Sequence, residues 1–285
     1  MPEITDFGSI VLVASAGVFV AVLSLRLAER FSLPNAALFL CAAGLLAASS
    51  ETLRDALDIQ TVERIGVVAL IVILFDGGLH IGLERFRRSA VPILALGTLG
   101  TFATAGLVAL AGHYVLGLEW ITAGLIGAAI APTDPVVTFS VLGGREIRGR
   151  SGTILEGEAG TNDPVGIALM IGMIELATED DAGFGIVVEE FALEMAIGLA
   201  IGVAGALALM PVMRSVRLTS PPLYPIRVLA AAGVIYGLAS VAHGSGFLAV
   251  FVAGVLLGDV AAPRKGEIES FHSSLAALAE IAAFA

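Results

Sequence analysis

The sequence predicts an all-α protein, a polytopic bundle of membrane-spanning helices. Hydrophobic residues make up 57% of the 285 residues and charged residues only 14%, whereas soluble domains carry about 25% charged residues. Apolar stretches long enough to cross a bilayer recur along the chain, and only short turns separate them. In hydrocarbon, such stretches satisfy their own backbone groups only as helices.

About ten spans are expected, the last of them incomplete. The turns between them are rich in Pro, Gly and charge, as in "RFRRSAVP", "GGREIRGR" and "RLTSPPLYP", and none is long enough to be a soluble domain. We therefore treat 1–285 as a single integral membrane domain. The predicted spans, in order, are 8–25, 33–48, 65–83, 90–116, 119–142, 151–175, 190–213, 225–243, 246–262 and a tenth from Ser270 that stops at Ala285.

Basic residues predict how these spans are oriented. Of the 15 Lys and Arg residues, 13 fall in the connections after odd-numbered spans, and only Arg54 and Arg64 fall on the other side. The positive-inside rule then places the N-terminus outside and the basic turns in the cytoplasm of a multi-pass protein of the cell (inner) membrane. No basic run or aromatic platform suggests a nucleic-acid partner, so the lipid bilayer is the expected environment.

Two adjacent spans place carboxylates near the middle of the bilayer. Asp163 lies 13 residues beyond Arg150, or ~20 Å along a helix, and Asp134 lies 11 residues before Arg145, or ~16 Å from the same face. A charge at this depth costs at least about 3 kcal/mol, and such residues usually line an ion path or a proton relay. The alternative is that one of them is a packed, protonated structural acid.

The motif "APTDPV" predicts a break in the first of these helices. Pro132 and Pro135 flank Thr133 and Asp134, and each proline removes an amide donor and clashes with the preceding turn. An unwound segment at the midplane is tolerated where it lines a cavity, and secondary transporters build ion sites in this way. A simple proline kink is the alternative.

Spacing sorts the polar residues of the next helix, "LEGEAGTNDPVGIALMIGMIE". Glu158 and Asn162 share one face and Asp163 lies on the neighbouring face, so we expect Asp163 to point at the break while Asn162 and Glu158 support it from the side. Hard cations prefer oxygen ligands. A carboxylate that binds either a proton or a cation is an exchange element.

These motifs resemble the paired signature of the monovalent cation/proton antiporters, the family of bacterial sodium–proton and potassium–proton exchangers. "APTDPV" followed by "EGEAGTNDPVGIAL" carries the resemblance, and "LFDGGL" at 74–79 is similar to a third-helix motif of the family. The resemblance implies a secondary antiporter, not an enzyme, with Na⁺ or K⁺ and H⁺ as substrates and no cofactor. The "GTNDP" context favours the potassium–proton branch slightly.

The resemblance also implies roles for individual residues. Thr133, Asp134, Asn162 and Asp163 would bind the ion and the proton, with Asp163 and Asp134 as the carboxylate ligands of the alkali cation. Glu158 matches a glutamate that pairs with an arginine on a later helix in relatives, and Asp76 matches an acid near the inner ion path. Many relatives have a serine where Ala159 stands, and Thr161 is a candidate substitute.

By the same resemblance, the fold contains an inverted repeat with a broken helix, C-terminally truncated here. Residues 90–175 would form the ion-translocating core, and 8–83 and 190–285 a scaffold that forms a homodimer. Because Asn162 is an amide and cannot release a proton, we expect electroneutral exchange. The alternatives are a cation-coupled solute symporter or channel of similar architecture, and an intramembrane aspartyl protease using Asp134 and Asp163.

Overall fold

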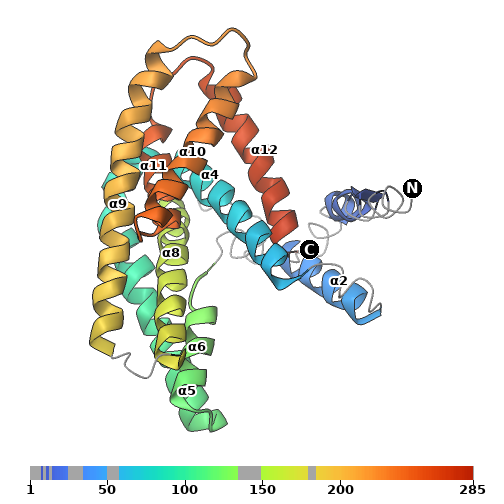
Figure 1. Cartoon of the computed structure of the whole chain (residues 1–285), viewed down its shortest axis with the longest axis vertical. Helices are drawn as coiled ribbons and strands as arrows, with labels where there is room; N and C mark the ends of the chain where they lie inside the picture. The colour runs from blue at the N-terminus through green and yellow to red at the C-terminus, as the bar shows by residue number, and fades with distance from the viewer. Residues whose placement is uncertain are drawn as a thin grey trace. The chain divides into compact units, whose positions relative to one another are not determined.

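The computed structural model describes residues 8, 11–12, 15–24, 35–49, 58–133, 149–178 and 184–284. Every regular element in these ranges is a helix, which confirms the all-α prediction (Figure 1). The helices form two compact units. The described residues up to Ile73 and from Ser273 onward belong to unit 1, and those from Leu74 to His272 belong to unit 2.

Unit 1 has a small apolar core. It contains a helix at Ser15–Ser24, α2 (Asn35–Ser49), the start of α4 (Ile59–Leu94) and the end of α12 (Lys265–Phe284). Ala21, Phe39 and Ile281 are buried together, with Val18 packed against them. Large apolar side chains elsewhere in this unit, such as Leu45, are mostly exposed, as expected of helices that face lipid.

Unit 2 carries the remaining helices. The predicted span 151–175 falls within α8 and 190–213 within α9, while 225–243 is offset from α10 by two residues. Among the described residues, three helical stretches are long and apolar enough to cross a bilayer, Ile59–Leu116, Val188–Ser215 and Leu223–Val241. The total number of spans stays a prediction. The elements after α4 are η1 (a π-helical turn, Ala95–Gly100), α5 (Thr101–Leu116), α6 (Trp120–Ile130), α8 (Arg150–Thr178), α9 (Phe184–Ser215), α10 (Leu223–Val241), α11 (Gly246–Gly258) and α12.

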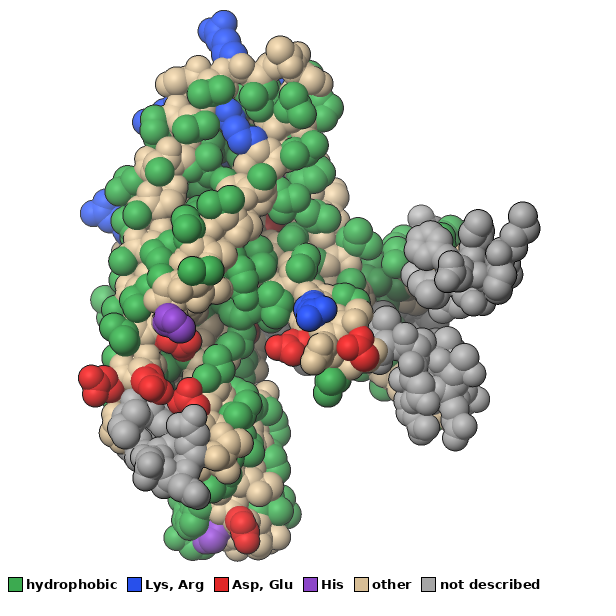
Figure 2. Space-filling view, in the orientation of Figure 1, with side chains coloured by type: hydrophobic (Ala, Val, Ile, Leu, Met, Phe, Trp, Pro, Cys, Tyr) green, Lys and Arg blue, Asp and Glu red, His purple; other side chains and the backbone are tan. Residues whose placement is uncertain are grey.

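The two ends of unit 2 carry opposite charges. Glu190 and Glu194 lie near the start of α9 and Arg214 lies in its last turn, so that Glu194 and Arg214 are separated by ~30 Å along the helix. Figure 2 shows Lys and Arg side chains over the end of unit 2 where α9 leads into α10, and acidic side chains over the end where α9 begins. The separation matches the thickness of a hydrocarbon core, about 30 Å.

The segment "RFRRSAVP", residues 85–92, was predicted to be a turn, and this prediction is wrong. The structure is helical from Ile59 through η1 to Leu116, and within α4 only Gly82 leaves the helical region, with φ 67° and ψ 159°. This conformation is open essentially to glycine alone. One residue therefore redirects the chain, and the charged segment that follows is free to form the next helical turns.

Asp259, the C-terminal capping residue of α11, stabilises this kink. Its carboxylate oxygen Oδ2 accepts the backbone N–H of Glu84 at 2.7 Å, where the helix resumes after Gly82. The first N–H groups of a helix have no partner within the helix, and an anionic acceptor there is favourable. The side chain also occupies the space beside Gly82, where a Cβ would lie 2.6 Å from Asp259 Oδ1.

We predict that Gly82→Ala lowers the free energy of unfolding by at least about 1 kcal/mol, because alanine is strained at this φ and ψ and its Cβ meets Asp259. The matched control is Gly77→Ala in the same helix, where a Cβ would meet nothing within 4 Å and where alanine favours helix. Thermal unfolding in detergent, followed by circular dichroism, measures both. Equal melting temperatures for the two variants would contradict the prediction.

Candidate ion-binding site

The candidate site lies where α6 ends beside α8. α6 ends at Ile130, and Pro132 and Thr133 have no regular structure, in agreement with the predicted break at "APTDPV". Pro132 has no N–H with which to continue the helix. Asp134 and Pro135, the second half of the predicted break, lie outside the described residues.

Thr133 contacts two polar side chains one turn apart on α8. Its hydroxyl Oγ1 lies 3.2 Å from each carboxylate oxygen of Glu158, to which it donates. The amide Nδ2 of Asn162 donates to Thr133 Oγ1 at 2.9 Å and to Glu158 Oε1 at 2.8 Å. The three side chains thus form a closed hydrogen-bond network, which joins the broken segment to α8.

Asn162 is fully buried, with 0% of its surface exposed, whereas Thr133 is exposed. The amide oxygen Oδ1 of Asn162 accepts no hydrogen bond from any described residue. A buried acceptor left without a donor costs about 1–3 kcal/mol. The network therefore combines a buried oxygen that lacks a donor among the described residues with an exposed residue, Thr133.

Close packing holds α8 in position. A Cβ at Gly97 of η1 would lie 2.7 Å from Thr161 Cβ, and a Cβ at Gly166 would overlap the ring of Pro132. Both positions therefore require glycine for α8 to approach its neighbours. The contact at Gly166 places the end of α6 directly against α8, one turn beyond Asn162.

The other residues of the predicted site occupy different positions. Asp163 follows Asn162 on α8 and is half-buried. Thr161, the candidate substitute for a missing serine, is buried and donates its hydroxyl to Gly157 O at 2.7 Å within its own helix. The contact of Asn162 with Thr133 is direct, where the sequence had suggested support from the side. In the sequence, the spacing of Glu158 and Asn162 by one helical turn indicates that both side chains can reach the same residue, which is Thr133.

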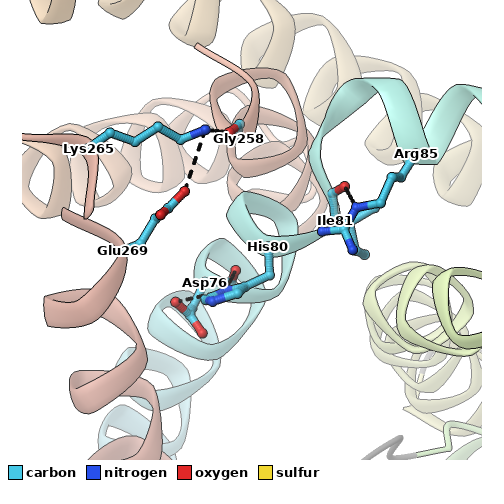
Figure 3. A network of polar contacts seen from close by, with 7 residues as sticks. All are labelled: Asp76, His80, Ile81, Arg85, Gly258, Lys265 and Glu269. Atoms are coloured by element: carbon cyan, nitrogen blue, oxygen red, sulfur yellow. Dashed lines mark hydrogen bonds and ion pairs between the residues drawn. The ribbon is translucent and has the colours of Figure 1, made fainter. Parts of the chain in front are cut away.

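Asp76 lies in a separate polar network on α4 (Figure 3). His80 Nδ1 lies 3.3 Å from Asp76 Oδ1 and 2.9 Å from the backbone oxygen of Asp76. On α12, Lys265 Nζ lies 3.5 Å from Glu269 Oε1. Lys265 also donates to Gly258 O at the end of α11. No role was predicted for His80, although its four-residue spacing from Asp76 signals the contact.

Comparison with known proteins gives a consistent result. A family model described as sodium/hydrogen exchanger, transmembrane, matches residues 15–284. The chain is 34% identical to the K(+)/H(+) antiporter NhaP of Alkalimonas amylolytica over 79% of this chain and 39% of that protein. It is 29% identical to NhaP2, a K(+)/H(+) antiporter of Shewanella baltica (strain OS223), over 90% of this chain and 45% of that protein. The chain thus spans less than half the length of these curated relatives.

The fold also resembles a solved structure. The sodium proton antiporter MjNhaP1 from Methanocaldococcus jannaschii, determined at pH 8, matches with a TM-score of 0.76 and 22% sequence identity. The match covers 100% of this chain and 70% of that one. At this identity the likeness concerns the fold.

We predict that Thr133→Val lowers the free energy of unfolding by about 1–3 kcal/mol, because valine keeps the shape but removes a hydrogen bond to a charged acceptor and leaves Asn162 Nδ2 with one partner fewer. Thr133→Ser, which keeps the hydroxyl, should retain most of the stability. Thr178→Val is the control, since the Thr178 hydroxyl is exposed and donates only to Ile174 O. Chemical unfolding in detergent gives the three values, and a loss in Thr178→Val as large as in Thr133→Val would refute the assignment.

Proposed function

Because the chain belongs to the sodium/hydrogen exchanger family, we propose that the protein containing it is a secondary antiporter that exchanges an alkali cation for protons. The relatives are transporters rather than enzymes. Both of the curated relatives named above are K(+)/H(+) antiporters, which favours potassium over sodium as the cation.

The observation that carries the proposal is the unsatisfied oxygen of Asn162 beside Thr133 and Glu158. An alkali cation is bound by oxygen atoms, and the amide oxygen, the Thr133 hydroxyl and the neighbouring carboxylates offer a set of them. A cation held there would remove the cost of the orphan acceptor. We place the ion and the exchanged proton at Asp163, next to Asn162, with Asp134 as the second carboxylate.

Exchange follows from competition at this carboxylate. A carboxylate in hydrocarbon is strongly disfavoured when its charge is uncompensated, so it binds a cation or a proton and is rarely empty. Each therefore displaces the other, and access from alternate sides of the membrane converts this competition into counter-transport. The Thr161 hydroxyl donates its proton to Gly157 O, so Thr161 could bind a cation only through the lone pairs of its oxygen.

The orientation and the domain roles are parts of the same proposal. We place the end of unit 2 with Arg87, Arg88 and Arg214 in the cytoplasm and the N-terminus outside, in the inner membrane, supported by the charge separation along α9. Residues 90–175 would move as the ion-carrying core against a scaffold formed by 8–83 and 190–285, with two copies forming a dimer. Asp76 would lie on the inner ion path.

We predict that Asp163→Asn abolishes exchange in the complete protein, because the amide can neither release a proton nor offer a charge to the cation. Everted membrane vesicles with a fluorescent pH probe measure the dequenching on addition of K⁺ or Na⁺. Glu175→Gln, a change of another acid on α8 near the acidic end, is the control and should transport normally. Normal exchange by Asp163→Asn would refute the site.

We further predict that exchange is electroneutral, with one proton for one cation. Asn162 occupies the position where a second acid would carry a second proton, and an amide cannot do so. The membrane potential, worth about 2.3 kcal/mol per charge per 100 mV, then does no work on the cycle. In proteoliposomes, an imposed potential should leave the initial rate and the end point unchanged. A voltage-dependent rate would assign a second proton to Glu158.

A further inference from the structure

A pocket of about 640 Å³ opens at the basic end of unit 2. It is lined by the part of α4 that follows Gly82, by the last turns of α9 and by the end of α11. It lies apart from the candidate ion site, since its lining includes neither Thr133 nor any residue of α8. Three arginines line it, Arg87, Arg88 and Arg214, which is an unexpected charge for a cation path.

The acids around this pocket are already engaged. Glu84 forms an ion pair with Arg88, and Asp259 accepts the backbone N–H of Glu84 at 2.7 Å. The side chains of Arg87 and Arg214 form no hydrogen bond or ion pair with any described residue. Both line the same pocket from different helices, Arg87 from α4 and Arg214 from α9. The pocket thus contains two guanidinium groups without an ion-pair partner among the described residues, and its three arginines outnumber its two acids, Glu84 and Asp259.

The rest of the lining is apolar. It consists of Leu83, Met210, Leu256 and Val260. Arg214 lies ~30 Å along α9 from Glu194 at the acidic end, so the pocket lies at the level where hydrocarbon meets head groups. A ligand that fits both parts has an anionic group and an apolar continuation. A free inorganic anion has no apolar part that could pack against these side chains.

We propose that this pocket binds the phosphate of an anionic phospholipid. The phosphodiester would bridge Arg87 and Arg214, because guanidinium groups bind phosphate oxygens in bidentate fashion. The glycerol and the first acyl carbons would lie against Leu83, Met210 and Leu256. Basic pockets between helices at the cytoplasmic side of a membrane protein recognise lipid head groups by the same physics. A bound lipid would join the second half of α4 to α9.

The test is lipid binding, which does not depend on transport. The purified protein is titrated with phosphatidylglycerol or with phosphatidylcholine, and the bound lipid is quantified by native mass spectrometry. For Arg87→Gln/Arg214→Gln we expect an affinity for phosphatidylglycerol about tenfold lower, a loss of two charge-assisted contacts. Arg217→Gln is the matched control, an exposed arginine at the same end that does not line the pocket, and should bind as the unmodified protein does.

Several outcomes would overturn the proposal. Unchanged phosphatidylglycerol binding in the double glutamine variant, or equal binding of phosphatidylcholine by the unmodified protein, would show that the pocket does not recognise an anionic head group. Displacement of the lipid by millimolar inorganic phosphate would assign a free-ion site instead. If the double glutamine variant unfolds in phosphatidylcholine micelles, Arg87→Lys/Arg214→Lys decides. This double lysine variant keeps both positive charges but lacks the planar guanidinium groups that bind phosphate through paired hydrogen bonds. We therefore expect an unchanged melting temperature and weaker lipid binding. Full affinity in this variant would refute bidentate recognition.

Discussion

A helix that ends within a packed bundle leaves its last carbonyl groups without partners in the helix, and buried polar groups near that end need partners elsewhere in the protein. At the end of α6 the partners come from α8. Glu158 and Asn162 bond to Thr133, and Gly166 lets the ring of Pro132 approach closely enough for that contact. The break, the polar face of α8 and the small residues around it are therefore one arrangement. The amide oxygen of Asn162 still lacks a donor among the described residues, and it is this oxygen that we propose a cation would bind.

The sequence predicted the parts of this arrangement that depend on local chemistry. Apolar length predicted α8 and α10 to within a few residues, because a run of spanning length in hydrocarbon has only the helix available to it. Pro132 of "APTDPV" predicted the end of α6. Helical spacing placed Glu158 and Asn162 on one face. Each of these inferences needs only residues that are close together in the chain.

The parts that the sequence did not predict depend on residues far apart in the chain. Residues 85–92 look like a turn because arginines and Pro92 cluster there, but the change of direction occurs at Gly82 alone. It is stabilised by Asp259, whose contact with Glu84 spans 175 positions of sequence. The direct contact of Asn162 with Thr133 likewise depends on how α8 packs against α6, which spacing within α8 does not determine.

The bend of α4 at Gly82 depends on contacts with another helix, α11. Four residues before the kink, Gly78 lies against the backbone of α11, where a Cβ would be 2.5 Å from Phe251 O and 2.8 Å from Val255 N. Two residues after the kink, the Glu84 N–H bonds to Asp259, the residue that ends α11. The segments of α4 before and after Gly82 thus both contact α11, which stabilises the bend between them. The angle between them is set by the length of α11 between its two attachment points, so inserting or deleting a residue in α11 would re-aim the second segment of α4 without any change in α4 itself.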